Sequence, residues 1–341
     1  MASFVPRSSF AFASTIPKTY FIGHHVTGIQ KMGQLLPTIG LIVECRDSRL
    51  PLSTKNGVLD RLVAGRQRLV VYTKSDLGAT TAQAQKHLAG LCRDPVVFWA
   101  KNKPQSTRSI IAHFRSLAHR QDSILALRVL IIGMPNVGKS SLLNSLRCHG
   151  ASNPRTGSTH KVAPTSNHAG CTRKVGTPVC IVPSHDKGGV AAGVYLLDSP
   201  GVFQPFVQDA ETMVKIALAL GVKNGLVHDE ILADYLLYRL NLWDPALYQR
   251  YCPPTNDIDV VLGCIAKRLG KLKAGGLPNI AQAAAQFLNQ WRIGALGHNI
   301  LDDISDTALT LHEALLHEPP LSLNQARKSH AQQLKLNRMP T

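Results

Sequence analysis

One short segment constrains this chain more than any other. Residues 133–140 read Gly-Met-Pro-Asn-Val-Gly-Lys-Ser, which fits the pattern G-x-x-x-x-G-K-[ST]. An apolar run, 129–132, precedes the segment, and a helical pattern, 140–147, follows it. In that setting the glycines let backbone N–H groups curl around an anion, and the helix N-terminus adds its positive end. The sequence therefore predicts a phosphate-binding loop between a strand and a helix.

The chemistry of bound phosphates assigns roles to the residues of this loop and to one partner segment. Lys139 is expected to reach the β- and γ-phosphates, and Ser140 to bind Mg²⁺. The strand-like run 193–198 ends at Asp198, which we predict as a second Mg²⁺ anchor acting through water. The N–H of Gly201 would then touch the γ-phosphate. The predicted phosphate-binding set is Asn136, Val137, Gly138, Lys139, Ser140, Ser141 and Gly201.

A polar segment lies between these two Mg²⁺ anchors. Residues 149–170 are rich in Ser, Thr, Asn, Gly and His, which favours a loop. Thr172 follows it and is the preferred candidate for a switch threonine that closes on Mg²⁺ and the γ-phosphate. Other nearby threonines compete for this role, Thr165 and Thr177 among them.

A second element indicates which base is bound. Residues 73–76 read Thr-Lys-Ser-Asp after a short apolar run and resemble the guanine-reading pattern [NT]-K-x-D. One carboxylate accepts both guanine donors, N1–H and the exocyclic amine, whereas adenine presents an acceptor that a carboxylate would repel. The stem of Lys74 would lie against the base, and the segment after the next strand would add a second contact. The predicted guanine-binding set is Thr73, Lys74, Asp76, Ala100 and Lys101.

The order of these elements predicts the architecture. The base-reading segment precedes the phosphate loop, the reverse of an ordinary GTP-binding domain, so we expect a circularly permuted P-loop NTPase of the α/β class with a mostly parallel sheet. The apolar run 35–43 is expected to be one of its strands, ending near Glu44. This GTP-binding domain should cover residues 21–210.

The second part of the chain has a different pattern. Strand signals disappear after about residue 211, and apolar residues in 279–292 recur with helical spacing behind Asn279, a suitable N-cap. We therefore expect an all-α domain over residues 211–320. A basic tail, 321–341, should follow it.

Composition limits the partners and the class of protein. There are 38 Lys and Arg against 21 Asp and Glu, a net charge of +17, which favours a polyanionic partner. No run of about 18 apolar residues is present, so a membrane-spanning helix is not expected. The seven cysteines form no C-x-x-C pair, which argues against a disulfide scaffold or a zinc site.

The beginning of the chain is unusual in its own way. The first 43 residues contain no acidic side chain, and Arg7 and Lys18 lie among serines and phenylalanines. This composition is typical of a mitochondrial targeting leader, which we place at residues 1–20. The alternative is an ordinary basic arm.

Four features together resemble the circularly permuted GTPases that assemble the large ribosomal subunit in bacteria and mitochondria. The first is the permuted order, and the second is Arg-Asp-Ser-Arg-Leu-Pro-Leu-Ser at 46–53, similar to D-A-R-x-P-x-S. The third is Phe-Ile-Gly-His-His at 21–25, similar to F-P-G-H-M, and the fourth is 287–297, similar to F-R-x-G-x-L-G. The likeness runs from about residue 20 to 303. Departures from the family pattern occur at Ser48, Ile22 and His25.

The resemblance implies a function and further site residues. It implies GTP hydrolysis, with GDP as product, coupled to maturation of the mitochondrial large ribosomal subunit. Ribosomal RNA would contact the helical domain, and the protein would associate peripherally with the matrix face of the inner membrane. His24 matches the proposed catalytic histidine, which fits the presence of Val202 where many GTPases carry a water-orienting Gln. Asn136 resembles an asparagine that lets related GTPases bind K⁺.

Two other interpretations of the same sequence stay open. One is an RNA-binding or membrane-tethered scaffold in which the nucleotide is structural and turnover is slight. The other is an ATP-using phosphotransferase. The complete set of Lys139, Ser140 and Asp198 favours turnover over a scaffold, and Asp76 favours guanine over adenine.

Overall fold

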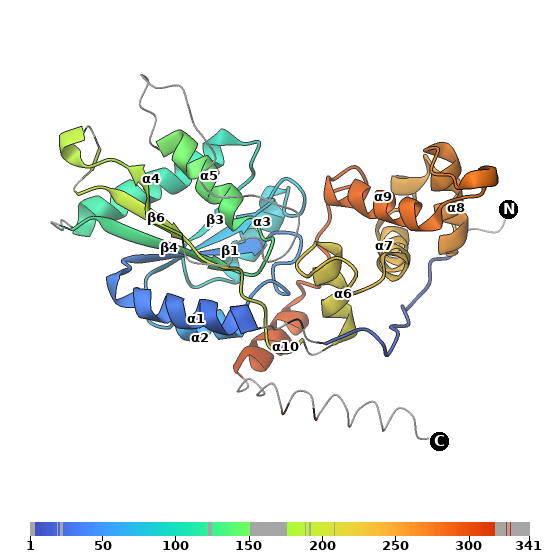
Figure 1. Cartoon of the computed structure of the whole chain (residues 1–341), viewed down its shortest axis with the longest axis horizontal. Helices are drawn as coiled ribbons and strands as arrows, with labels where there is room; N and C mark the ends of the chain where they lie inside the picture. Colours follow the sequence, from blue (N-terminus) through green and yellow to red (C-terminus); the bar gives the residue numbers. More distant parts are fainter. Residues whose placement is uncertain are drawn as a thin grey trace.

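The computed structural model describes residues 4–18, 20, 23–121, 125–150, 176–187, 189–190, 192–207, 209–317, 325 and 328. Within these residues the centre of the α/β part is a six-stranded sheet with the strand order β3-β2-β1-β4-β6-β5 (Figure 1). The strands are β1 (Leu41–Asp47), β2 (Arg68–Thr73), β3 (Val96–Phe98), β4 (Leu127–Gly133), β5 (Val179–Val182) and β6 (Val194–Asp198). Only β5 pairs antiparallel, so the mostly parallel sheet is confirmed.

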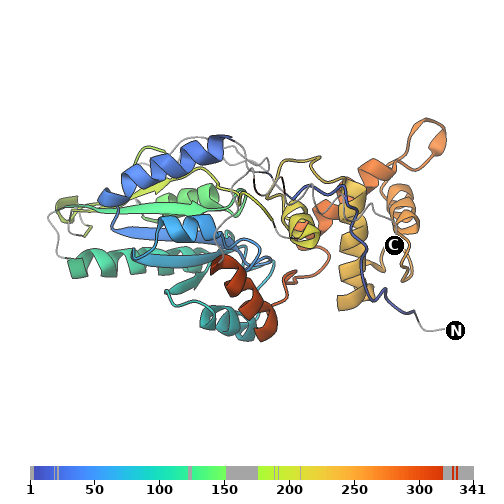
Figure 2. The same cartoon turned by 90° about the horizontal axis from the view of Figure 1, so that it is seen from below.

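Helices cover both faces of this sheet. They are α1 (Gly23–Leu35), α2 (Gly57–Leu62), α3 (Ala82–Gly90), α4 (Pro104–Gln121) and α5 (Lys139–Gly150). Alternate residues of β1 point to opposite sides: Val43 and Cys45 pack with α4 and α5, whereas Ile42 packs with α1 and α2. Figures 1 and 2 show these two helical layers on either side of the strands.

The strand expected over residues 35–43 is wrong in its first half. Leu35 is the last residue of α1, Leu36–Thr38 form a 3₁₀ turn, and β1 begins only at Leu41. A short apolar run has the same pattern whether it ends a buried helix or forms a buried strand. Gly40 separates the two elements here.

The second part of the chain is helical, as predicted. It contains α6 (Ala210–Leu218), α7 (Asp229–Trp243), α8 (Ile258–Arg268) and α9 (Ile280–Arg292). The side chain of Asn279 caps α9, because its Oδ1 accepts from the N–H of Gln282 at 3.2 Å. Phe287, Leu288 and Trp291 on the apolar face of α9 are buried, and α7 and α8 pack against this helix. Short 3₁₀ turns are η1 (Leu36–Thr38), η2 (His185–Lys187), η3 (Pro245–Tyr248) and η4 (Ala274–Gly276).

After α9 the chain returns to the α/β part. The N–H of Leu301 donates to the carbonyl of Arg49 at 2.8 Å, and the carboxylate of Asp302 accepts from the N–H groups of Leu52 and Ser53 at 2.9 and 2.8 Å. These contacts lead into α10 (Asp306–His317), which lies against the sheet side of the molecule (Figure 2). The C-terminal segment therefore joins the two parts a second time.

Some predicted features fall outside the described residues. Thr172 is one of them, and the basic tail 321–341 is another, apart from Gln325 and Lys328. The backbone of His24 belongs to α1, but its side chain is not among those described. In the part of the chain that is described, no helix has the length and apolar character needed to cross a membrane.

Candidate nucleotide site

The phosphate loop connects β4 to α5 in the geometry that its sequence predicts. Gly133, Asn136 and Gly138 have positive φ angles of 145°, 56° and 99°. A Cβ on Gly133 would lie 2.5 Å from the carbonyl oxygen of Cys45, so only glycine fits there. Lys139 folds over the loop and donates to the carbonyl of Met134 at 2.7 Å. The ammonium group of Lys139 is therefore buried within the loop. Burial lowers the pKa of Lys139, and the nearby carboxylate of Asp198 opposes this shift.

The two predicted Mg²⁺ anchors meet beside this loop. The Ser140 hydroxyl donates to Oδ2 of Asp198 at 2.6 Å, and burial raises the pKa of Asp198 against the effects of Lys139 and Ser140. The other carboxylate oxygen, Oδ1, is buried and has no hydrogen-bond partner among the residues that the structure describes. Such an oxygen suits a water molecule bound to a hard cation, because Mg²⁺ keeps several waters and takes few protein ligands.

The segment after β6 packs directly on the phosphate loop. A Cβ on Gly201 would lie 2.7 Å from Cα of Pro135 and 2.8 Å from its nitrogen. The N–H of Val202 donates to the carbonyl of Gly133 at 3.3 Å, and the Val202 side chain is buried. Gln204 donates through Nε2 to the carbonyl of Lys55 at 3.2 Å.

The base-reading segment grips the phosphate loop with two side chains. The Thr73 hydroxyl donates to the carbonyl of Val137 and lies 3.1 Å from the carbonyl of Arg46. The ammonium group of Lys74 donates to the carbonyl of Asn136 at 2.9 Å. Residues about 60 positions apart in the chain are therefore joined. Threonine performs this bracing in place of the commoner asparagine.

The remaining predicted base contacts lie on two adjoining loops. The N–H of Ser75 donates to the carbonyl of Trp99 at 3.1 Å, which ties the loop after β2 to the loop after β3. Asp76 is half-buried on the first loop. On the second loop Ala100 is buried and Lys101 is exposed.

Asp47, at the end of β1, is a residue whose role was not predicted. Its carboxylate accepts from Nε and Nη2 of Arg49 at 3.0 and 2.7 Å and from Lys74 at 2.7 Å. Burial alone would raise the pKa of Asp47, but the two cations hold it below its ordinary value. The Arg49 guanidinium also lies over the Trp291 ring, 4.7 Å from its centroid. Its place in the 46–53 segment, where Asp47 and Arg49 match D and R of the pattern D-A-R-x-P-x-S, was the available signal.

His25 is the second residue whose role was missed. Its ring is buried, and Nδ1 lies 3.1 Å from the carbonyl oxygen of Gly201 and 3.3 Å from the nitrogen of Phe203. One nitrogen cannot donate to the first and accept from the second at once, so the tautomer selects the contact. The imidazole therefore ties α1 to the segment after β6. Its adjacency to His24 was the only sequence signal.

Asn136 makes a contact outside the α/β part. Its Nδ2 donates at 2.7 Å to the carbonyl of Leu220, in the turn that follows α6. Arg292, at the end of α9, reaches the same region and donates to the carbonyl of Leu218 at 2.8 Å. The phosphate loop is thus hydrogen-bonded to the start of the helical part.

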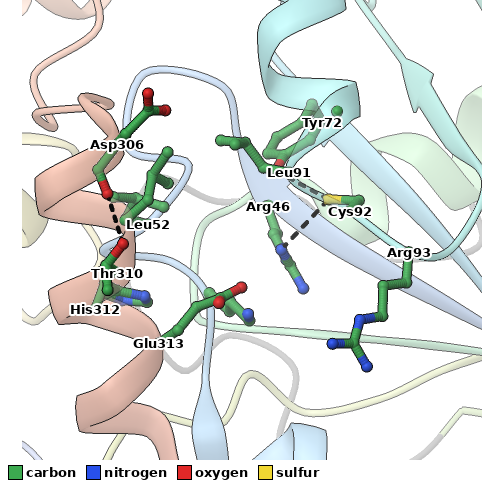
Figure 3. A pocket seen from close by; sticks show the side chains of 13 residues that line it. Arg46, Leu52, Tyr72, Leu91, Cys92, Arg93, Asp306, Thr310, His312 and Glu313 are labelled. Carbon is green, nitrogen blue, oxygen red and sulfur yellow. Dashed lines mark hydrogen bonds between the residues drawn. The ribbon is translucent and has the colours of Figure 1, made fainter.

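A separate cavity of about 350 Å³ lies between α10, the end of α3 and residues of the interior strands β1 and β2 (Figure 3). Arg46 points into it, with Nη1 4.0 Å from the Cys92 sulfur, and Arg93 and Glu313 lie at its rim. Burial lowers the pKa of His312 to about 4, so this lining residue is neutral at pH 7. The cavity shares no lining residue with the phosphate loop, and its mixed charges give no preference for a ligand.

Comparisons with known proteins agree with this geometry. Residues 128–241 match the family of 50S ribosome-binding GTPases. The chain is 33% identical over 311 residues to "Mitochondrial GTPase 1" of Schizosaccharomyces japonicus, covering 84% of this chain and 91% of the relative. It is 32% identical over 307 residues to "Mitochondrial ribosome-associated GTPase 1" of mouse, covering 83% and 89%.

The fold also has a counterpart among solved structures. The crystal structure of GNP-bound YlqF from T. maritima superposes with a TM-score of 0.50 at 20% identity, covering 81% of this chain and 98% of that one. This likeness supports the fold, namely an α/β GTPase domain followed by helices. The two relatives and the matched family lead to one conclusion: the chain belongs to the mitochondrial GTPase 1 family of ribosome-associated GTPases.

Proposed function

We propose that this protein binds GTP and hydrolyses it to GDP and phosphate. The observation that carries the proposal is the contact between two segments far apart in the chain. Thr73 and Lys74 both donate to carbonyl groups of the phosphate loop. A nucleotide whose phosphates lie in that loop would therefore place its base near the residues that follow Lys74. Asp76, Ala100 and Lys101 would then contact guanine. Because the base-reading segment comes first, we propose that the domain is circularly permuted.

Mg²⁺ is the cofactor that the polar groups beside the loop suit best. Ser140 would bind it directly, and Asp198 through water, for which its unpartnered buried oxygen is suited. The ion supplies charge neutralisation at the phosphate oxygens. Lys139 would reach the β- and γ-phosphates, together with the N–H groups of residues 136–141.

In the proposed reaction a water molecule attacks the γ-phosphorus, and the bond to the β–γ bridging oxygen breaks. GDP leaves with the bridging oxygen, the γ-phosphoryl group keeps the oxygen of the water as inorganic phosphate, and a proton of the water passes to the solvent. Val202 cannot orient this water, since its side chain is apolar and buried. We assign that task to His24, the closing of the site to Thr172, and the sensing of the γ-phosphate to the N–H of Gly201. Asn136 would hold K⁺ beside the phosphates.

The names of the relatives extend the proposal to a cellular role. They are called mitochondrial and ribosome-associated, and the matched family is described as ribosome-binding. We propose that this protein acts in the mitochondrial matrix, where GTP turnover supports assembly of the large ribosomal subunit. The net charge of +17 suits contact of its helical part with ribosomal RNA and peripheral association with the inner membrane.

Exchanging Asp76 for Asn tests the assignment of the base. The carboxylate would accept two hydrogen bonds from guanine, so Asp76→Asn should weaken GTP binding by about 100-fold. It should improve binding of XTP, whose 2-oxygen can accept from the new amide. Competition of GTP, ATP and XTP for a fluorescent nucleotide measures both effects. Glu230→Gln, an exposed acid on α7, serves as the control. An unchanged preference in Asp76→Asn would remove this residue from base reading.

Sedimentation with mitochondrial large ribosomal subunits tests the cellular role. Binding should be stronger with a non-hydrolysable GTP analogue than with GDP if the protein is a switch. Equal binding in both states, with no stimulation of turnover by the subunit, would favour the scaffold interpretation instead.

A further inference from the structure

The segment that precedes α1 is packed onto the helical part of the molecule. We call residues 4–18 the N-terminal arm; in Figures 1 and 2 it is the dark blue chain that runs along α7. Arg7 contacts Asp234 of α7 with both ends of its guanidinium, Nη2 to Oδ1 at 2.6 Å and Nη1 to Oδ2 at 3.2 Å. Nη2 also donates to the main-chain carbonyl of Asp234 at 3.3 Å. Such a two-pronged pair fixes the position as well as the charge of both groups.

The backbone of the arm is held as firmly as this side chain. Asn256, just before α8, donates through Nδ2 to the carbonyl of Val5 at 2.9 Å. Its Oδ1 accepts from the N–H of Arg7 at 3.3 Å. One amide thus satisfies a donor and an acceptor of an extended chain, as a neighbouring strand would. Asn241 of α7 donates to the same Oδ1 at 3.2 Å, which fixes the orientation of the Asn256 amide.

The apolar residues of the arm join the core of the helical part. The ring of Phe10 meets Tyr235 edge to face at 5.3 Å, and Phe12 lies 5.8 Å from the same ring. Ile16 is only 3% exposed and belongs to the same buried cluster as α7 and α9. Aromatic pairs of this kind contribute beyond the area they bury. A segment with such contacts is part of the folded protein.

The other end of the arm contacts the segment that follows Gly201. The carbonyl of Lys18 accepts from the N–H of Val207 at 2.8 Å. Just beyond it, the ring of Tyr20 meets Phe203 edge to face at 5.7 Å and lies 6.2 Å from His25. The arm therefore spans the distance between α7 and the segment that follows Gly201.

We infer that the N-terminal arm stays in the working protein as a strap between the helical part and the segment after β6. A leader that is removed after import has no need of a paired arginine or a buried isoleucine. Removal of residues 4–18 would leave the Asp234 carboxylate without its guanidinium and uncover the ring of Tyr235. If the beginning of the chain also directs import, any cut must fall before Arg7. The inference concerns the folded chain itself and does not depend on the proposed GTP hydrolysis.

A charge exchange tests the contact without removing the arm. In the full-length protein, Arg7→Asp and Asp234→Arg should each lower the melting temperature by about 2–4 °C. The double variant should recover at least half of the summed loss, because the pair is restored in reverse. Arg66→Asp, on an exposed arginine of the α/β part, is the matched control and should change little. Single variants that behave like this control, or a double variant with the full summed loss, would overturn the strap.

A second measurement addresses the protein in the cell. The chain is isolated from its native mitochondria, and its first residue is determined by N-terminal sequencing and intact mass. The expected first residue lies at or before position 6. A mature chain that begins at Arg7 or later would overturn the inference, even if the charge exchange succeeded with the recombinant protein.

Discussion

The two ends of the candidate nucleotide site are held in different ways; we call residues 133–140 with Gly201 the phosphate end, and the proposed base-reading segment 73–76 the base end. At the phosphate end the backbone sets the shape, through the positive φ angles of Gly133 and Gly138 and the close packing of Gly201 on Pro135. At the base end the loop is held by side chains from neighbouring strands, and their charges converge on Asp47. The first arrangement follows from a few consecutive residues, and the second exists only once the sheet has formed.

We expect substitutions at the two ends to have different effects, one on GTP turnover and the other on the stability of the protein. At the phosphate end the shape is set by the backbone, so we expect a change of the Lys139 side chain to have little effect on the loop around it. The base end depends on a buried carboxylate between two cations, and breaking such a cluster leaves uncompensated charge. We therefore expect lost activity from changes at the phosphate end and lost stability from changes at the base end.

The largest expected effect comes from Lys139→Ala at the phosphate end. Loss of a cation that stabilises charge in the transition state should reduce GTP turnover by about 1,000-fold, roughly 4 kcal/mol. Stability should hold, because burial already lowers the pKa of Lys139 and its charge is costly to bury. Single-turnover hydrolysis and thermal unfolding measure the two effects. Lys86→Ala on the exposed side of α3 is the control. A Lys139→Ala protein within about tenfold of the original rate would contradict the phosphate assignment.

Asp47→Asn at the base end should act on stability instead. It leaves Arg49 and Lys74 without their carboxylate and should lower the free energy of unfolding by about 3 kcal/mol at pH 7. Urea unfolding measures this loss. Glu230→Gln, which removes an exposed carboxylate, is the control. A stability equal to that of the control would mean that the cluster does not hold the base end together.

The stabilisation that Asp47 receives from Arg49 and Lys74 should depend on pH. The pKa of Asp47 is lower in the folded protein than its ordinary value of about 3.9. Its stabilisation is therefore present above about pH 4 and is lost as the pH falls toward the folded pKa. The difference in unfolding free energy between the original protein and Asp47→Asn should shrink on acidification below pH 4. A difference that stays constant down to pH 2 would contradict this origin.

The same contrast explains what could be predicted from sequence. The phosphate loop, α5 and α9 depend on local patterns, a glycine spacing or an apolar face with a cap, and their positions agree with prediction. The roles of Asp47 and His25 depend on partners more than 20 residues away, Lys74 in one case and Gly201 in the other. Both residues lie in short segments with a recognisable pattern, 46–53 and 21–25, but neither pattern reports a contact with a distant partner.

Helix α1 is an element of secondary structure that the sequence did not predict. It was not predicted, because Gly28 and Gly33 lower helix propensity and no acidic residue occupies its first turn. In the structure the helix packs at Gly28 on the segment after β6, where a Cβ would make ordinary contacts with Pro200 at 3.6 Å and with Val202 at 4.0 Å. This contact with a distant segment stabilises the helix, and the local sequence does not report it.

The smallest expected effect lies where the two ends meet, at Thr73. Its hydroxyl is the link from the base-reading segment to the carbonyl of Val137, so Thr73→Val should weaken GDP binding by about tenfold. Thr73→Asn should stay within about threefold of the original affinity, because an amide can donate to the same carbonyl. Thr80→Val, on an exposed threonine, controls for the loss of a hydroxyl. Unchanged GDP binding in Thr73→Val, which keeps the side-chain volume but removes the hydroxyl, would mean that this bond does not join the two ends. The two ends would then be coupled through packing, and the contrast between backbone and side-chain control would not extend to their junction.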